Sequence, residues 1–246
     1  MRIVATRLHT TNEDKVIDTK SIKDWCDHVL TYCDFLIVVV DTKYLKSIQD
    51  AKEYFKDKIQ IFQITPWISF TQPLNLLVEK ALSMGAKELL FQSIEVEISS
   101  NDVLKLEKHL NNDTLVVGAK LHTRHGHLKK ISTIDGWNTP WNTLALWDIE
   151  KLGLTGFLSI SSGNLEKIPG GIEEVVTISL LQSLKKDEMK AKVIELSSVV
   201  WTTKWDSKQR EIYHQKKMAS KDERSQIQLK KLGIKAGVVE MIDESV

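Results

Sequence analysis

The chain has 246 residues, of which 34 are Lys or Arg and 33 are Asp or Glu, so its formal net charge is +1. This balance excludes a globally basic nucleic-acid-binding protein, and an apolar fraction of 42% excludes an intrinsically disordered chain. The longest apolar run, at 35–40, is far shorter than the roughly 20 residues of a membrane-spanning helix. Cys26 and Cys33 are expected two turns apart on one helix, about 10 Å from each other and too far for a disulfide. We therefore expect reduced thiols and a cytoplasmic protein without a transmembrane segment or a nucleic-acid partner.

The first half of the chain alternates between strand patterns and helix patterns. Strands are expected at residues 2–8, 35–40, 59–64, 89–92 and 114–121. Helices are expected at residues 21–32, 45–55, 72–84 and 100–110. The third helix should stop at Gly85, and Ser100 or Asn101 should cap the fourth. The alternation predicts an α/β fold with a mostly parallel sheet sandwiched by helices.

The second half is less regular and contains five of the seven tryptophans. It is expected to hold a loop at 126–142, helices at 140–152 and 172–184, strands at 156–161 and 192–200, and one long polar helix at 205–232. Residues 204–235 hold ten Lys or Arg and four Asp or Glu, so this segment is +6 and the remainder of the chain is −5. We therefore expect a main domain at 1–203 and a basic helical C-terminal extension at 204–246.

Polar residues follow three of the expected strands. Thr6 and Arg7 close the first strand, Asp41 closes the second, and 93–95 follow the fourth. Ligands of parallel sheets bind at the carboxyl ends of the strands. The sequence therefore predicts a binding site at this edge before any motif is considered.

Four segments resemble inverting GT-A glycosyltransferases of the family-2 type, in the order in which those enzymes carry them. The text PLNLLVEKALSMGAKELLFQSIEVEIS, at 73–99, is similar to their central block, where a helix carrying an Asn (here Asn75) leads into a hydrophobic strand and a DxD motif. Segment 35–41 resembles their second strand, which ends in an acidic residue near the nucleotide base. Segment 170–174 resembles the acidic acceptor-side motif at the start of a helix, and His214 lies where these enzymes often place a metal-binding His. The resemblance spans roughly residues 1–215.

The sequence departs from that family at the DxD motif, which becomes Ser93-Ile94-Glu95. The resemblance implies that Glu95, with His214, holds Mg²⁺ or Mn²⁺ on the diphosphate of the donor, because hard divalent ions prefer carboxylate oxygens. The alternative is a structural Glu at the end of a strand. The resemblance further implies a donor-binding set around the nucleotide: Thr6, Arg7, Asp41, Asn75 and Ser93.

Glu173 and Glu174 follow two glycines at the expected start of a helix. In one interpretation the two carboxylates complement the helix dipole. In the other, which the resemblance favours, one of them is a general base that deprotonates an acceptor hydroxyl. Glu173, the earlier of the pair, is the preferred candidate.

A tryptophan-rich segment is the candidate acceptor site. Trp137, Trp141 and Asn142 combine flat aromatic faces, which stack on sugar rings, with an amide that bonds hydroxyl groups. The alternative is a helix whose inner face is made of Trp141, Leu144 and Ala145.

Two basic segments have their own alternatives. The cluster at 122–127 has HxxH spacing but no nearby Cys or acid at metal spacing, so we expect solvated loop histidines rather than zinc ligands, or phosphate contacts if the loop covers the donor. The basic helix at 205–232 is expected to pack on the main domain or on a second subunit. Its alternative is attraction to a diphosphate or to an anionic lipid-linked acceptor.

We expect a glycosyltransferase that moves a sugar from a nucleotide-diphosphate donor to an unknown hydroxyl acceptor, with inversion and a divalent metal. One alternative is a non-catalytic protein that binds a sugar nucleotide or a glycan on the same scaffold. The other is a nucleotidyltransferase acting on a sugar phosphate, since 5–8 resembles the signature of those enzymes. They need a glycine-rich loop, and no Gly occurs before Gly85.

Overall fold

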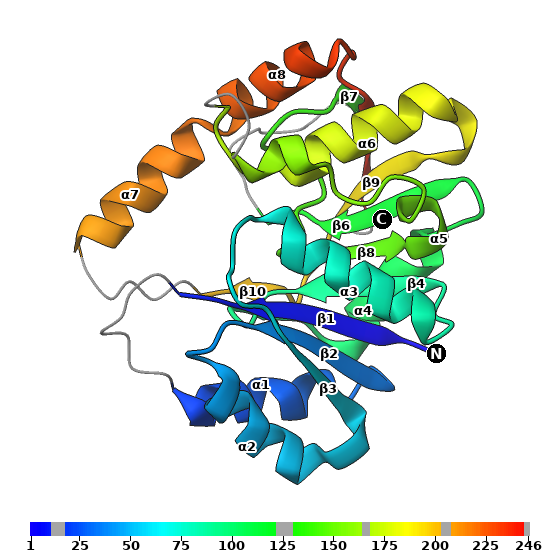
Figure 1. Ribbon diagram of the computed structural model, residues 1–246. Helices are drawn as coiled ribbons and strands as arrows, with labels where there is room; N and C mark the ends of the chain where they lie inside the picture. The colour runs from blue at the N-terminus through cyan, green and yellow to red at the C-terminus, as the bar shows by residue number, and fades with distance from the viewer. Residues whose placement is uncertain (11–17, 122–129, 164–167, 203–207, 244–246) are drawn as a thin grey trace.

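The computed structural model describes residues 1–10, 18–121, 130–163, 168–202 and 208–243 (Figure 1). The strands are β1 (Ile3–Leu8), β2 (Phe35–Val40), β3 (Ile59–Gln63), β4 (Glu88–Gln92), β5 (Val96–Glu97), β6 (Thr114–Ala119), β7 (Ile131–Thr133), β8 (Leu144–Asp148), β9 (Lys190–Glu195), β10 (Val200–Trp201) and β11 (Val238–Asp243). The α-helices are α1 (Thr19–Val29), α2 (Leu45–Phe55), α3 (Thr71–Ser83), α4 (Ser100–His109), α5 (Ile149–Leu152), α6 (Glu173–Leu184), α7 (Lys208–Ala219) and α8 (Lys221–Leu232).

The centre of the molecule is a nine-stranded sheet with the order β3-β2-β1-β4-β8-β6-β9-β11-β7. Strand β8 is antiparallel to both of its neighbours, and β7 is antiparallel to β11. The other paired neighbours run parallel, in the register that aligns Ile3 with Phe35 and Leu89. The predicted mostly parallel sheet is therefore confirmed.

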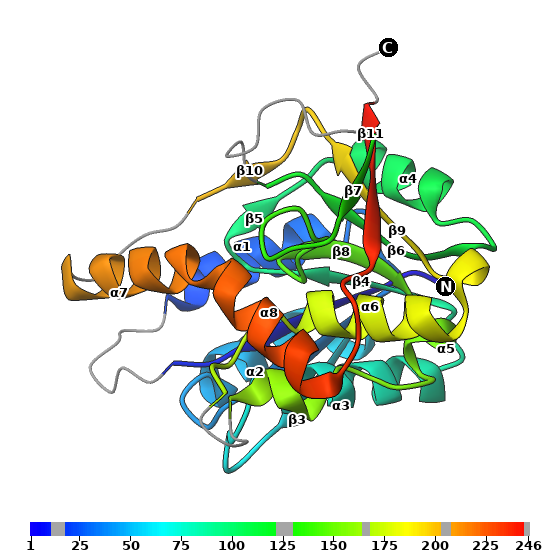
Figure 2. The ribbon, with the colours of Figure 1, turned by 90° about the horizontal axis from the view of Figure 1, so that it is seen from above.

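Helices cover both faces of this sheet and close two separate cores (Figures 1 and 2). Helices α1, α2 and α4 pack on one face, and α3, α5, α6 and α8 pack on the other. Strand β2 contributes Ile37 and Val39 to one core and Leu36, Val38 and Val40 to the other. Successive side chains of a strand point to opposite faces, so a strand covered on both sides has a continuous apolar sequence.

Local signals fix several helix ends. Helix α3 ends just before Gly85, whose φ of +76° suits glycine, as the sequence predicts. Helix α4 is capped by Ser99, whose side chain accepts a hydrogen bond from the Asp102 N–H, and not by Ser100 or Asn101. Helix α1 ends at Val29, so Cys33 lies beyond it rather than on the same helix as Cys26. Both thiols are free and buried, as expected.

The expected helix at 140–152 is wrong. Residues 144–148 form strand β8 in the middle of the sheet, and only the short helix α5 follows. Four consecutive apolar residues, from Leu144 to Trp147, are all buried, alternately in the two cores. A helix with one apolar stripe cannot bury such a run on both sides, whereas a central strand can.

Three other expectations in the second half are also corrected. Residues 156–161 form no strand but a loop and a 3₁₀ turn, Ser159–Ser162. The expected strand at 192–200 is divided between β9 and β10, and β10 pairs with β5 in a separate two-stranded sheet. Residues 238–243, expected in a helical extension, form β11 between β9 and β7.

The expected single helix at 205–232 is two helices, α7 and α8, which meet at Ser220. The loop at Gly136 packs directly against the backbone of Lys221, and the Gly136 N–H donates to Asp222 Oδ1 at 3.0 Å. This contact with the body stabilises the start of α8 at a position where local sequence would let one helix continue. Among the described residues, none of the helices is long and apolar enough to pass through a bilayer.

Candidate active site

Two neighbouring cavities lie at the carboxyl ends of the first strands. The β1–β4 cavity, of about 130 Å³, is lined by Ala5, Thr6, Arg7, Leu74, Phe91, Gln92, Ser93, Asn142 and Thr143. The β1–β3 cavity, of about 380 Å³, is lined by His9, Thr10, Asp41, Thr42, Lys43, Ile64, Thr65 and Trp67. The structure thus brings together four residues from the predicted donor and acceptor sets, Thr6, Arg7, Ser93 and Asn142, and places Asp41 in the adjoining cavity.

Asp41 organises the wall of the β1–β3 cavity. Its carboxylate accepts hydrogen bonds from the N–H groups of Thr10 at 2.9 Å, Lys43 at 2.9 Å and Tyr44 at 3.2 Å. The His9 ring stacks on Trp67 with 4.6 Å between centroids, and burial lowers the pKa of His9. Sequence reasoning missed His9 and Trp67, although each follows the end of a predicted strand. The His9–Trp67 stack gives this cavity a flat aromatic wall, and Asp41 adds a polar group to its lining.

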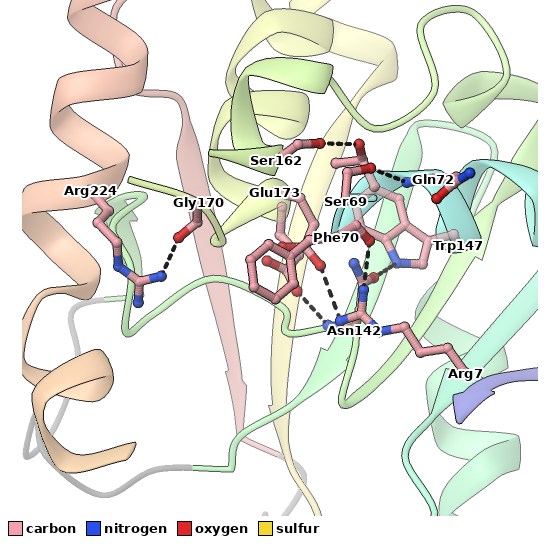
Figure 3. Close-up of polar contacts among 12 residues, drawn as sticks. Arg7, Ser69, Phe70, Gln72, Asn142, Trp147, Ser162, Gly170, Glu173 and Arg224 are labelled. Carbon is pink, nitrogen blue, oxygen red and sulfur yellow. Dashed lines mark hydrogen bonds and ion pairs between the residues drawn. The ribbon is translucent and has the colours of Figure 1, made fainter. Parts of the chain in front are cut away.

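The two predicted acids begin α6 beside the β1–β4 cavity. Gly171, with φ +92°, and Ile172, with φ +62°, turn the chain so that Glu173 and Glu174 open the helix. Both are buried, with 5% and 6% of their surface exposed. Figure 3 shows Arg7 reaching this region from β1; its Nη2 lies 3.4 Å from Glu173 Oε1, and its Nη1 donates to the Phe70 carbonyl at 2.9 Å.

Glu174 is tied to the segment that follows the tryptophans. Its Oε1 accepts a hydrogen bond from the Asn142 N–H at 2.7 Å. Burial, and then the neighbouring charge of Glu173, raise the pKa of Glu174 to about 7. A carboxyl group with such a pKa is partly protonated at neutral pH, where an ordinary glutamate is ionised.

Two lysines of the C-terminal helices interact electrostatically with the acid pair. Lys221 is buried, and this burial lowers its pKa to about 7, with Glu174 acting in the opposite direction. Burial also lowers the pKa of Lys217, while Glu173 acts in the opposite direction. Sequence reasoning located the basic segment but did not identify these two lysines as part of the site.

The predicted acceptor residues divide into two groups. Asn142 lines the cavity, its Oδ1 accepts from Trp147 Nε1 at 2.9 Å, and its buried Nδ2 has no hydrogen-bond partner among the described residues. Trp137 and Trp141 are both buried and pack on each other, with 6.2 Å between their centroids. The Trp141 indole also donates to the Gly136 carbonyl at 3.0 Å. The two tryptophans therefore support the segment that carries Asn142.

Asn75, from the predicted donor set, is hydrogen-bonded to the backbone of Phe157. Its Nδ2 donates to the Phe157 carbonyl at 2.9 Å, and its Oδ1 accepts from the Phe157 N–H at 2.7 Å. This pair of bonds joins α3 to the loop after α5. The histidine cluster at 122–127 lies outside the described residues.

The predicted metal ligands do not provide a fitting set of donors. Glu95 is exposed, and its Oε2 lies 3.4 Å from Trp201 Nε1. Burial lowers the pKa of His214, and the neighbouring charges of Lys217 and Lys221 lower it further. In the described part of the chain, no three His, Cys, Asp or Glu side chains gather around one point. One exposed carboxylate and a histidine among cations do not fit a divalent metal.

Comparison with known proteins identifies the fold. The sequence matches no protein-family model and no curated protein. The structure resembles 4-diphosphocytidyl-2C-methyl-D-erythritol synthase from Anaerococcus prevotii DSM 20548, with TM-score 0.53 and 15% identity over 88% of this chain and 96% of that chain. It also resembles residues 1–349 of S. aureus TarS, with TM-score 0.51 and 14% identity over 82% of this chain and 60% of that chain.

A third similar structure is that of GalNAc-T7 with UDP, GalNAc and Mn²⁺, with TM-score 0.53 and 10% identity over 76% of this chain and 41% of that chain. Identities this low establish a shared fold and nothing further. The chain has a GT-A-like α/β fold, with a large, mostly parallel sheet flanked by helices, which confirms the fold class expected from the sequence.

Proposed function

We propose that this protein is a glycosyltransferase that moves a sugar from a nucleotide-diphosphate donor to a hydroxyl acceptor with inversion. The observation that carries the proposal is the buried acid pair at the start of α6. Glu173 contacts Arg7 and Glu174 contacts Asn142, and both contacted residues line the β1–β4 cavity. A base and a binding cavity in contact are the two parts that transfer to a hydroxyl group needs.

In this proposal the two cavities take different parts of the donor. The β1–β3 cavity receives the nucleotide base and ribose, with the His9–Trp67 stack as the aromatic wall and Asp41 fixing the surrounding loops. Thr6, Arg7 and Ser93 face the donor from the β1–β4 cavity. Asn75, Trp137 and Trp141 act by holding the segments around the site.

Glu173 is the proposed general base. It would take the proton of the acceptor hydroxyl as the acceptor oxygen attacks the anomeric carbon and the bond to the diphosphate breaks. Glu174 is a positioning residue, because one of its oxygens already accepts the Asn142 N–H. No step is assigned to a divalent metal, since Glu95 and His214 do not form a fitting donor set.

A nucleotidyltransferase acting on a sugar phosphate is the second candidate. The match to the synthase from Anaerococcus prevotii covers 88% of this chain and 96% of that chain, so the two proteins share a fold over most of their lengths. In such a reaction a phosphate oxygen of the sugar phosphate would attack the α-phosphate of a nucleoside triphosphate and release pyrophosphate. The two candidates therefore differ in the products they release.

The test is a product assay with nucleotide sugars of different bases, and in parallel with nucleoside triphosphates and sugar phosphates. Glu173→Gln should lower turnover by about 10²–10⁴-fold, the range for loss of a general base, with nucleotide binding retained. Glu174→Gln should have a smaller effect, and Glu150→Gln, at the exposed first turn of α5, should have none.

Turnover unchanged by both Glu173→Gln and Glu174→Gln would contradict the mechanism. Dependence on a triphosphate with release of pyrophosphate would select the nucleotidyltransferase. Binding of a nucleotide sugar without turnover would select a non-catalytic binding protein.

A further inference from the structure

Two lysines of the C-terminal helices carry buried charges that the proposed mechanism does not use. Lys221 is 9% exposed, and its Nζ lies 2.9 Å from the centroid of the Trp141 ring and 5.5 Å from that of Trp137. Lys217 is half-buried, with its Nζ 4.8 Å from the centroid of the Phe70 ring. Among the described residues, neither ammonium donates a hydrogen bond or forms an ion pair within 4 Å. Aromatic faces stabilise a cation only weakly compared with the cost of removing it from water.

The region around the acid pair has more positive than negative side chains. Helix α6 contributes two carboxylates, whereas β1, α7 and α8 contribute four cations: Arg7, Lys217, Lys221 and Arg224. Asp222 faces a different group, the Gly136 N–H. The excess of positive charge in a buried region favours an anionic ligand there.

Arg224 is distinguished from the lysines by its contacts. It donates from Nη1 to the Gly170 carbonyl, from Nη2 to the Lys217 carbonyl at 2.7 Å, and from Nε to the Ser220 carbonyl at 3.3 Å. Its guanidinium is therefore committed to holding α7 and α8 against the loop before the acid pair. The lysine ammonium groups keep their donors for a ligand.

The lysines lie beside residues that line or contact the donor cavity. The Nζ of Lys217 lies over the ring of Phe70, whose carbonyl accepts a hydrogen bond from Arg7 of the β1–β4 cavity. The Nζ of Lys221 lies over the ring of Trp141, the residue before Asn142 of the same cavity. A donor diphosphate requires positive charge nearby, and the described acids and histidines do not fit a divalent metal that would supply it.

We infer that Lys217 and Lys221 bind the diphosphate of the nucleotide donor in place of a divalent metal, so that donor binding is independent of metal. This inference rests on the proposed function and adds to it the source of the positive charge. As the bond between the sugar and the diphosphate breaks, its electron pair moves to the leaving phosphate oxygen. The two ammonium groups stabilise that charge, while the acceptor proton goes to Glu173.

The test measures the binding of pyrophosphate and of UDP, CDP, GDP and ADP by calorimetry, in EDTA and in Mg²⁺ or Mn²⁺. The variants are Lys217→Met and Lys221→Met, which keep the length of the side chain and remove its charge. The matched controls are Lys216→Met and Lys230→Met, exposed positions on the same two helices. Thermal melting establishes that each variant is folded, and Lys221→Gln replaces Lys221→Met if the latter unfolds. Lys221→Arg is added as the variant that keeps the charge.

We expect at least one diphosphate to bind equally well with EDTA and with metal. Lys217→Met and Lys221→Met should each weaken that binding by about tenfold to a hundredfold, the loss typical of a hydrogen bond to a charged group, and Lys221→Arg should retain most of it. The two controls should change it by less than about twofold.

Binding that disappears in EDTA would overturn this inference and leave the proposed transferase intact. Equal binding by the lysine variants and their controls would overturn it as well. If none of the diphosphates binds under any condition, the inference and the proposed function both fail.

Discussion

At the scale of single residues, two neighbouring carboxyl groups differ because their partners differ. Glu173 meets the guanidinium of Arg7, whereas Glu174 meets a backbone N–H and the like charge of Glu173. Its backbone N–H bonds and the charge of Lys221 do not offset the cost of burying this carboxylate, so the pKa of Glu174 rises. The consequence is a stability that depends on pH.

Glu174→Gln should reduce that dependence. The pKa of Glu174 is raised from its ordinary 4.5 to about 7 in the folded protein. Between those values the folded protein keeps a proton that the unfolded chain releases, so the free energy of unfolding falls as pH rises, by up to about 1.4 kcal/mol per pH unit. Lys221 contributes little below about pH 6, because its pKa is lowered to about 7 and it stays charged there.

The measurement is urea unfolding of wild type, Glu174→Gln and the control Glu150→Gln at closely spaced pH values between about 5 and 6, below the pKa of Lys221. Glu174→Gln should have the flattest pH profile of the three, and the Glu150→Gln profile should follow that of wild type. Parallel profiles for all three proteins would contradict the raised pKa.

The two thiols give a second prediction at this scale. Burial raises the pKa of Cys26 and of Cys33 to about 12, from an ordinary value of 9.0. Because the thiolate is the reactive form, alkylation at pH 8 should be about a thousandfold slower in the native protein than in urea. Mass spectrometry of iodoacetamide-treated protein measures both rates, and similar rates in the two states would contradict the buried positions.

At the scale of elements, the start of α6 depends on a close approach between two segments. Gly171 has φ +92°, and a Cβ at this position would lie 2.6 Å from Arg224 Nη1. Gln228, fully buried on α8, donates to the Pro169 carbonyl at 2.7 Å and to the Gly171 carbonyl at 3.1 Å. Helix α8 therefore holds in place the loop that precedes Glu173 and Glu174.

Gly171→Ala should test this contact, with Gly85→Ala as its control. Both positions have positive φ, but a Cβ at Gly85 has no neighbour within 4 Å. In the control Gly85→Ala, backbone strain alone should lower the free energy of unfolding by about 1–2 kcal/mol. Gly171→Ala should lower the free energy of unfolding by a further 1–3 kcal/mol, roughly the cost of overpacking. It should also lower the activity. Equal losses in chemical denaturation would show that Arg224 does not restrict this position.

At the scale of the whole molecule, the last described strand completes the sheet. Strand β11 lies between β9 and β7, with Val239 fully buried. It is fixed to α6 by Gln182, which accepts the Val238 N–H at 2.7 Å and donates to the Val238 carbonyl at 2.9 Å. The strand that follows α8 thus anchors the C-terminal helices to the main sheet.

A chain ending at Lys235 should therefore be far less stable than one ending at Asp243. The shorter chain loses both ladders of β11 and leaves β9 as an exposed edge. Removing β11 should therefore remove much of the free energy of unfolding, which is roughly 5–15 kcal/mol for a typical domain. Thermal unfolding of the two chains measures the difference, and equal melting temperatures would mean that β11 is dispensable.

The sequence by itself determined the alternation of strands and helices, the polar residues at the carboxyl edge of the sheet, the acid pair after two glycines and the basic C-terminal segment. These features rest on periodicity and on neighbours along the chain, which act locally. The tertiary structure decided that Leu144 to Trp147 form a central strand and that the basic helix divides at Ser220. It also decided that Arg7 meets Glu173, 166 positions away. Such choices depend on which surfaces cover a segment from both sides, and a pattern of residues along one segment does not contain that information.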